Sequence, residues 1–290
     1  MEGSTGAFEM KLAVLSGKGG TGKTFLAANL AAVSEEGVYV DCDTEAPNGR
    51  LLFRPEFMER TAVKAKIPAV DASRCDGCQI CTNFCRFHAL AYVKNRLMLF
   101  PEICHSCGGC VLFCPQHALQ ETEKTIGWVE AGRSGSHEVL SGILQEGEVS
   151  GVPIIKALQQ RVRDRQEIIV LDCPPGSSCS VRESIKTADY CVLAAEPTSF
   201  GTHNLQMVHE LLVLEGKPHG VVLNKCIEGA ENPAEQFCEA AGIPVLGKIP
   251  FRQDFNGILS EGRLVVRESL PGQQIFSALL QAISQEAGRR

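Results

Sequence analysis

The glycine-rich stretch from Gly17 to Thr24 constrains the fold of this chain more than any other feature of its sequence. It reads G-K-G-G-T-G-K-T, follows the apolar run 12–15 and precedes a helix-like segment at 25–32. This order of strand, loop and helix is typical of a nucleotide phosphate loop, whose backbone N–H groups bind phosphate oxygens at a helix N-terminus. Lys23 is then expected to reach the terminal phosphates, and the Thr24 hydroxyl to bind Mg²⁺. The candidate nucleotide-binding residues are Gly17, Gly19, Gly20, Thr21, Gly22, Lys23, Thr24 and Phe25. A glycine-rich turn without a ligand would require this order of residues to arise by accident.

A second lysine, Lys18, follows the first glycine of this loop. A loop of the form G-K-G-G-x-G-K-T resembles that of the MinD, ParA and Mrp group of ATPases. The resemblance implies a doubly wound, mostly parallel α/β fold and Mg²⁺-dependent hydrolysis of ATP to ADP. It also implies an ATP-dependent dimer, formed with a second copy or with a related ATPase, in which Lys18 reaches the partner's nucleotide. The residues alone would equally allow an exposed loop lysine.

Two aspartates at the ends of apolar runs are the candidates for handling water and metal. The run 38–40 leads into a D-C-D sequence that ends at Asp43, and the run 168–171 leads into Asp172. Because ligands of open α/β sheets bind at the carboxyl ends of the strands, we expect both carboxylates to lie beside the phosphates. Asp43 would then position the attacking water or be linked to the Mg²⁺, and Asp172 would hold the Mg²⁺ through water. The segments 41–48 and 172–176 resemble the first and the second switch, respectively, of the same ATPase group. The alternative for Asp43 is a simple turn cap.

Two later positions are candidates for binding the base. Asn224 ends the strand-like run 220–223, and Pro250 ends the run 244–249. An asparagine side chain carries both a donor and an acceptor, which suits the edge of adenine. The resemblance implies that Asn224 reads the base, with the loop after Pro250 beside it. Asparagine as a turn former remains the alternative.

Eight of the fourteen cysteines form an internal repeat that interrupts the ATPase pattern between residues 66 and 122. The sequence C-x-x-C-x-x-C-x-x-x-C occurs twice, 29 residues apart. These spacings match the bacterial ferredoxin run, in which three thiolates of one repeat and the fourth of the other bind each 4Fe–4S cluster. We therefore predict one cluster on Cys75, Cys78, Cys81 and Cys114, and another on Cys104, Cys107, Cys110 and Cys85. Zinc is the alternative, but zinc motifs usually pair two C-x-x-C knuckles across a longer gap.

The remaining cysteines and one departure from the repeat carry weaker signals. Arg86 follows the fourth cysteine of the first run, where the second run has Pro115. Proline there fixes the departing chain, so Arg86 leaves ligation possible and adds a positive charge that would raise the potential of one cluster. Most of the six other cysteines are expected to be small buried residues. Cys179 lies where the nitrogenase iron protein has a bridging ligand, but a second ligand for a shared cluster is missing.

Composition narrows the classes of partner. The net charge of −6 and the absence of a basic stripe argue against nucleic-acid binding. No apolar run approaches the ~20 residues of a membrane span, and the amphipathic tail 273–290 is expected to pack on the sheet and not to anchor the chain in a bilayer. The first ten residues lack the layout of an export signal. We therefore expect a cytoplasmic protein, in which abundant cysteines bind metal and do not form disulfides.

The predicted organisation is an ATPase domain interrupted by a small α+β ferredoxin-like domain. Residues 1–65 form the first part of the ATPase, 66–122 the insertion and 123–290 the second part. We expect electron transfer to an unidentified redox or iron–sulfur partner protein, driven by the ATPase cycle. The alternative is an ATP-dependent protein that assembles or carries iron–sulfur clusters, or that positions a complex, with clusters that sense redox state or hold structure.

Overall fold

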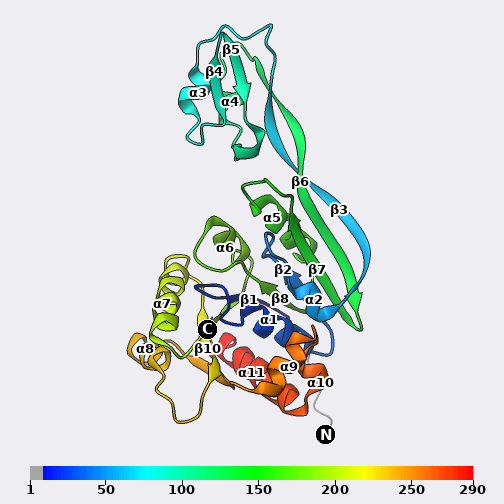
Figure 1. Ribbon diagram of the computed structural model, residues 1–290, viewed down its shortest axis with the longest axis vertical. Helices are drawn as coiled ribbons and strands as arrows, with labels where there is room; N and C mark the ends of the chain where they lie inside the picture. The colour runs from blue at the N-terminus through cyan, green and yellow to red at the C-terminus, as the bar shows by residue number, and fades with distance from the viewer. Residues whose placement is uncertain (1–8, 290) are drawn as a thin grey trace.

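The computed structural model describes residues 9–289, so residues 1–8, in which the sequence shows no export signal, lie outside the described range. An α/β body carries a small insert (residues 71–118) on a long two-stranded ribbon (Figure 1). The strands are β1 (Met10–Leu15), β2 (Gly37–Asp41), β3 (Glu56–Val70), β4 (Leu90–Val93), β5 (Arg96–Leu99), β6 (Leu119–Ser134), β7 (His137–Leu144), β8 (Ile168–Asp172), β9 (Tyr190–Ala195), β10 (His219–Cys226) and β11 (Val245–Pro250). The helices are α1 (Lys23–Ala32), α2 (Gly49–Phe53), α3 (Ile80–Phe84), α4 (Gly109–Leu112), α5 (Val152–Arg161), α6 (Cys179–Ser184), α7 (Ser199–Leu214), α8 (Pro233–Ala241), α9 (Gln253–Ser260), α10 (Val265–Glu268) and α11 (Leu270–Ala287), with a 3₁₀ turn at Pro101–Ile103.

The large sheet has the order β11-β10-β9-β1-β8-β2-β7-β6-β3. All neighbours from β11 to β7 run parallel, whereas β6 is antiparallel to both β7 and β3. The predicted doubly wound, mostly parallel α/β fold is therefore confirmed. Strand β8 lies between β1 and β2, and Asp172 at its end is opposite Val14 on one side and Asp41 on the other. This register brings both acidic strand ends to one edge of the sheet, with β8 next to the strand that precedes the phosphate loop and β2 one strand further away.

Helices cover both faces of the sheet because the central strands are apolar on both faces. In β1, Leu12 and Val14 pack with α1, α9, α10 and α11, whereas Ala13 and Leu15 pack with α5, α6, α7 and α8. The apolar stripe of the C-terminal tail is buried in α11 through Phe276, Leu279 and Ile283, and each such side chain contributes about 1.5–3 kcal/mol of transfer free energy. The prediction that the tail packs on the sheet is confirmed. Among residues 9–289, no helix is both long and apolar enough to cross a membrane.

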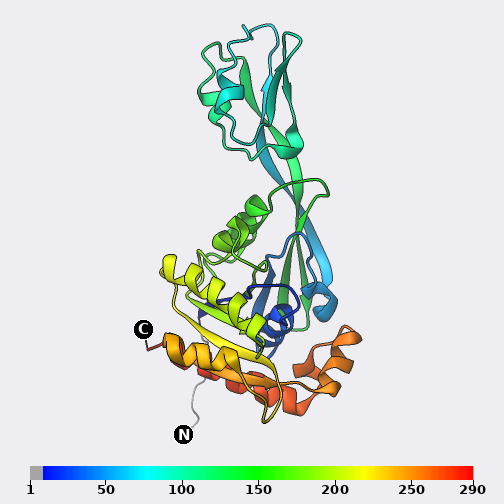
Figure 2. The same ribbon diagram turned by 60° about the vertical axis from the view of Figure 1, so that its left-hand side comes forward.

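The ribbon consists of β3 and β6, which pair antiparallel from the sheet edge outward to the insert (Figure 2). The predicted boundaries at 66 and 122 fall within this ribbon, where Ile67 is opposite Thr122. Segment 121–151 forms most of β6 and all of β7. Ion pairs Lys64–Glu123 (2.7 Å) and Lys66–Glu121 (2.8 Å) join the two strands of the ribbon on its solvent-exposed surface.

The two cysteine runs fold as intertwined copies of one unit. Left-handed backbone occurs in pairs 29 residues apart, at Gly77 and Ser106, Gln79 and Gly108, and His88 and His117. Each copy also donates a backbone hydrogen bond to the other, from Asp71 N–H to the Ala118 carbonyl and from Phe100 N–H to the Ala89 carbonyl, both at 2.8 Å. Each of these hydrogen bonds joins the beginning of one copy to the end of the other, so the end of each run lies beside the beginning of the other.

Candidate nucleotide site and cysteine cavities

The phosphate loop joins the end of β1 to α1, and its backbone conformation at Gly22 is one that only glycine allows. Gly22 has φ 91°, and a Cβ atom there would collide with the Asn224 side chain. Gly19 and Gly20 are exposed, and a Cβ atom on either would meet nothing within 4 Å. The loop is thus packed on its inner side and open on its outer side, which leaves room for phosphates above the N-terminus of α1.

Lys23 lies buried between the acidic strand ends. Its ammonium group donates to Asp172 and is 4.0 Å from Asp43 Oδ2, and the Tyr39 hydroxyl donates to the other Asp172 oxygen at 2.8 Å. Burial alone would lower the pKa of Lys23, but the nearby carboxylates, Asp172 above all, outweigh it and raise the pKa. Lys23 therefore remains charged. The structure brings together the predicted Lys23, Asp43 and Asp172.

The two aspartates of the D-C-D sequence have different surroundings. Asp41 is fully buried and accepts hydrogen bonds from the N–H groups of Gly49 (2.9 Å) and Asp43 (3.2 Å). Burial, reinforced by Asp172, raises the pKa of Asp41 well above its usual value. The Asp43 side chain is 21% exposed, and burial raises its pKa while Lys23 opposes that shift. Asp43 therefore faces the open side of the loop, whereas Asp41 fixes the start of α2, a role that sequence reasoning missed.

Lys18 is held by residues of its own chain. Its ammonium nitrogen lies 3.1 Å from Glu196 Oε2 and 4.6 Å from the centroid of the Phe200 ring. Lys225 binds the other Glu196 oxygen at 2.6 Å and the Gly20 carbonyl at 2.8 Å. Glu196 follows β9, and its partners are remote in sequence, so the pattern of the chain gives no signal for this contact.

The predicted base-binding residues meet beside the loop. A cavity of about 70 Å³ is lined by residues that include Gly22, Phe25, Asn224 and Pro250. Asn224 is buried, and its amide donates to the Thr21 carbonyl at 2.8 Å. Asn224 therefore also supports the phosphate loop. Thr24, the predicted Mg²⁺ ligand, lies in the first turn of α1 and is half-buried.

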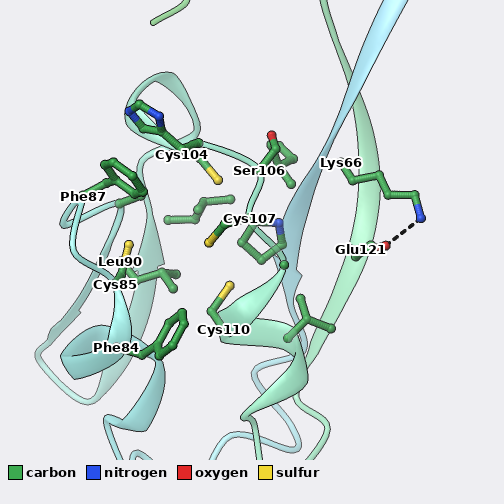
Figure 3. Close-up of a pocket in the computed structure, with 17 residues that line it drawn as sticks. Lys66, Phe84, Cys85, Phe87, Leu90, Cys104, Ser106, Cys107, Cys110 and Glu121 are labelled. Atoms are coloured by element: carbon green, nitrogen blue, oxygen red, sulfur yellow. Dashed lines mark hydrogen bonds and ion pairs between the residues drawn. The ribbon is translucent and has the colours of Figure 1, made fainter. Parts of the chain in front are cut away.

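The eight cysteines of the repeat surround two cavities in the insert. Cys85, Cys104, Cys107 and Cys110 line the cavity beside the ribbon, here called the ribbon-side cavity, and their sulfur atoms point into it (Figure 3). Cys75, Cys78, Cys81 and Cys114 line the second, distal cavity. These are the same two sets that the sequence predicts. Within residues 9–289, no group of three or more His, Cys, Asp or Glu side chains is placed to hold a single metal ion.

The cysteines outside the repeat are unpaired thiols. Those at 42, 173, 191 and 238 are buried, and Cys226 is half-buried, as expected for small apolar residues. Cys179 is exposed at the start of α6. Arg86 is exposed, next to a cysteine of the ribbon-side cavity.

Comparison with known proteins agrees with this architecture. The family model for the CobQ/CobB/MinD/ParA nucleotide binding domain matches residues 12–265. The uncharacterized protein MJ0578 of Methanocaldococcus jannaschii is 28% identical over 245 residues, which cover 83% of this chain and 86% of the relative. An uncharacterized ATP-binding protein of the same organism, MJ0823, is 26% identical over 251 residues, covering 84% and 86%. Among solved structures, the septum site-determining protein MinD of Pyrococcus horikoshii, complexed with Mg-ADP, superposes with a TM-score of 0.61 at 16% identity, covering 97% of this chain and 98% of that one. At this identity the likeness shows the fold alone.

Proposed function

The chain belongs to the CobQ/CobB/MinD/ParA nucleotide-binding family of P-loop ATPases, and on this premise we propose that it couples an ATP-driven dimerisation cycle to electron transfer through two 4Fe–4S clusters. The electron acceptor is a redox or iron–sulfur partner protein. The observation that carries the iron–sulfur part is the pair of cavities, each bordered by four thiols drawn from both repeats. Clusters bound by cysteines require reduced thiols, and this requirement suits a cytoplasmic protein.

On the ATP side, Lys23 exchanges one anionic partner for another. Its ion pair with buried Asp172 holds the ammonium group at the base of the loop, ready for the phosphates. When ATP binds, its phosphates would replace Asp172 as the ionic partner of the Lys23 ammonium group. Asp172 would then be available to hold Mg²⁺ through water, together with the Thr24 hydroxyl. Asp43, on the open side, orients the attacking water. Hydrolysis in such sites depends mainly on positioning and on electrostatic stabilisation of the transferred phosphoryl group.

Dimerisation requires Lys18 to break its ion pair with Glu196 of the same chain. Lys18 is partly exposed, with 30% of its side chain accessible, and lies at the mouth of the phosphate loop. A second negatively charged nucleotide, brought by a copy of this chain or by a related ATPase, would compete with Glu196 for this ammonium group. Lys18 would then stabilise phosphate charge on the partner's ATP, which makes turnover depend on the dimer.

On the iron–sulfur side, the donor sets fit cubanes better than single ions. A zinc ion would need its thiolates to converge at about 2.3 Å from one point. A 4Fe–4S cluster takes one thiolate on each of four irons, so its ligands stand around a cavity, as the two sets of four cysteines do. When bound, each cluster stores and releases one electron. The cysteines hold the clusters in the insert, and the ribbon connects that insert to the nucleotide site.

Anaerobic purification tests the proposed cofactors. The protein should carry about eight iron and eight sulfide per chain. Cys78→Ser and Cys107→Ser should each remove one cluster, because the two residues line different cavities. Stoichiometric zinc with negligible sulfide would contradict the proposal.

A second experiment separates electron transfer from cluster delivery. Protein with reduced clusters is mixed with ATP and with a purified apo-ferredoxin. If the function is electron transfer, the iron should stay with the protein in this mixture. In a parallel assay with methyl viologen as the oxidant, ATP should accelerate the oxidation of the clusters. Cluster assembly predicts instead that iron and sulfide move to the apo-ferredoxin when ATP is hydrolysed, with clusters that do not change redox state during turnover.

A further inference from the structure

We propose that Lys124 is a positioning residue that links the nucleotide state to the reduction potential of the ribbon-side cluster, through its ion pair with Glu148. The inference rests on the proposed function, because it requires a cluster in the ribbon-side cavity. It goes further by naming the two charges through which the ATPase body would act on that cluster.

Lys124 lies where the ribbon meets both the insert and the ATPase body. It is on β6, and its ammonium nitrogen is 2.6 Å from Glu148 Oε1 and 3.4 Å from the carbonyl oxygen of Pro101. Pro101 precedes the cluster ligand Cys104 by three residues in the insert. The hydrogen bond to Pro101 therefore holds the charge of Lys124 beside the segment of the insert that leads into this ligand.

Glu148 belongs to a loop, residues 145–151, that packs on the first switch. The strand before this loop is tied to Thr44, because Leu144 N–H donates to the Thr44 carbonyl at 2.9 Å. At the other end of the loop, a Cβ atom on Gly151 would collide with Thr44 Oγ1. Thr44 is buried and directly follows Asp43. Because these groups are in close contact, a shift of the first switch changes the position of the loop that carries Glu148.

The Lys124–Glu148 pair differs from the other ion pairs of the ribbon. Lys64 and Glu123 are 53% and 62% exposed, whereas Lys124 and Glu148 are 23% and 10% exposed, so solvent screens the second pair much less. The Lys66–Glu121 pair lies at the edge of the ribbon-side cavity (Figure 3), but both of its members belong to the ribbon and would move together. In the Lys124–Glu148 pair, one charge is on the ribbon strand β6 and the other is on the loop after β7, which also contacts Thr44.

The direction of the effect follows from electrostatics. Adding an electron makes the cluster more negative, so a nearby ammonium group favours the reduced state and raises the potential. Glu148 cancels part of that charge while it stays paired. A nucleotide that draws Glu148 away from Lys124 would therefore raise the potential. By linkage, reduction of the cluster must change the affinity for that nucleotide by the same factor.

The test is an EPR-monitored redox titration of the holoprotein with ADP and with a non-hydrolysable ATP analogue. In the wild type, one cluster is expected to differ in potential between the two nucleotides, and it should be the cluster that Cys107→Ser removes. Glu148→Gln should raise that potential and Lys124→Gln should lower it, and both should abolish its dependence on nucleotide. A tenfold difference in analogue affinity between oxidised and reduced protein corresponds to about 59 mV for one electron. Lys64→Gln is the matched control and should change neither quantity.

Three outcomes would overturn the inference while leaving the clusters in place. The potential of the ribbon-side cluster could be the same with both nucleotides, or the nucleotide dependence could survive in Glu148→Gln, or Lys64→Gln could act as Lys124→Gln does. Glu148→Gln serves as the deciding variant if Lys124→Gln loses iron, because it keeps the charge of Lys124. Failure of the proposed function is recognised separately, by the absence of iron and sulfide from the wild type.

Discussion

Replacing Glu196 with glutamine is expected to strengthen ATP-driven dimerisation, because the substitution frees Lys18. The ion pair between Lys18 and Glu196 spans 3.1 Å, with 30% and 16% of the two side chains exposed. A partly exposed pair of this kind contributes up to about 1 kcal/mol. The contact of Lys18 with the Phe200 ring is unchanged in the variant. Because each subunit of a dimer must release one lysine, the substitution removes a cost of up to about 2 kcal/mol, which corresponds to dimerisation that is up to about 30-fold tighter.

Sedimentation velocity over a concentration series, with a non-hydrolysable ATP analogue, measures this difference. Glu215→Gln is the control, because it breaks the Arg182–Glu215 pair (2.7 Å), whose side chains are 57% and 24% exposed and which involves no residue of the phosphate loop. Equal dimerisation in the wild type and both variants would refute the idea that Glu196 restrains Lys18. A weaker dimer in Glu196→Gln would also refute it, since that result would place Glu196 in the interface.

Three further predictions concern buried or loop charges. Lys23→Met should abolish ATP binding in calorimetry, and should lower the free energy of unfolding without nucleotide by about 3–5 kcal/mol in urea titrations, because Asp172 loses its counter-ion in a fully buried site. Lys18→Ala should retain much of the ATP affinity but lose dimerisation and turnover; an unchanged oligomer at saturating ATP would contradict the trans role. Burial lowers the pKa of His137 below its usual 6.5, with Arg267 adding to the shift, so the neutral form is favoured in the folded state. Its contribution to stability is therefore present above about pH 6.5 and is lost as the pH falls through the folded pKa, and His137→Phe should flatten this part of the pH dependence of urea unfolding.

The parts of the site that sequence reasoning predicted are those encoded by local spacing. The phosphate loop needs a fixed order of glycine, lysine and threonine within one turn, so its residues can be recognised from the sequence alone. The cysteine sets can be recognised for a similar reason, because the 29-residue repeat fixes which thiols are equivalent. The structure brings each set of four to one cavity, while the identity of what they bind stays a prediction.

The ribbon could not be predicted because only one of its strands carries an apolar face. In β3, Val63, Ala65 and Ile67 alternate with the exposed Lys64 and Lys66, but the facing residues 120–125 of β6 are all polar and show no such alternation. Its stability comes from fourteen paired positions along two strands and from charges that face each other across them. Such pairing depends on residues about 60 positions apart, which local pattern does not reveal. The partners of Lys18 and Lys124 were missed for the same reason.

The place of the insertion explains why the first switch is the element that would communicate with the clusters. The chain enters α2 directly after the switch, and Arg50 on α2 and Arg60 on β3 both bind Glu130 on β6, at 3.6 Å and 3.5 Å. The loop that carries Glu148 contacts the switch at Thr44. The ribbon is therefore tied to the first switch at two places, one at its base and one near the insert.

The second switch is tied to a different part of the site. Gly176 N–H donates to the Ser16 carbonyl at 2.9 Å, which joins the segment after Asp172 to the phosphate loop. A change there alters the loop itself, and it reaches the ribbon only through β8 and its neighbours. We therefore expect Asp43→Ala, which leaves ATP in place and holds the first switch, to keep the ribbon-side cluster at its ATP-state potential, and Gly176→Ala to impair turnover without fixing that potential. The opposite pattern, with Gly176→Ala fixing the potential and Asp43→Ala leaving it responsive, would show that the signal travels through the second switch.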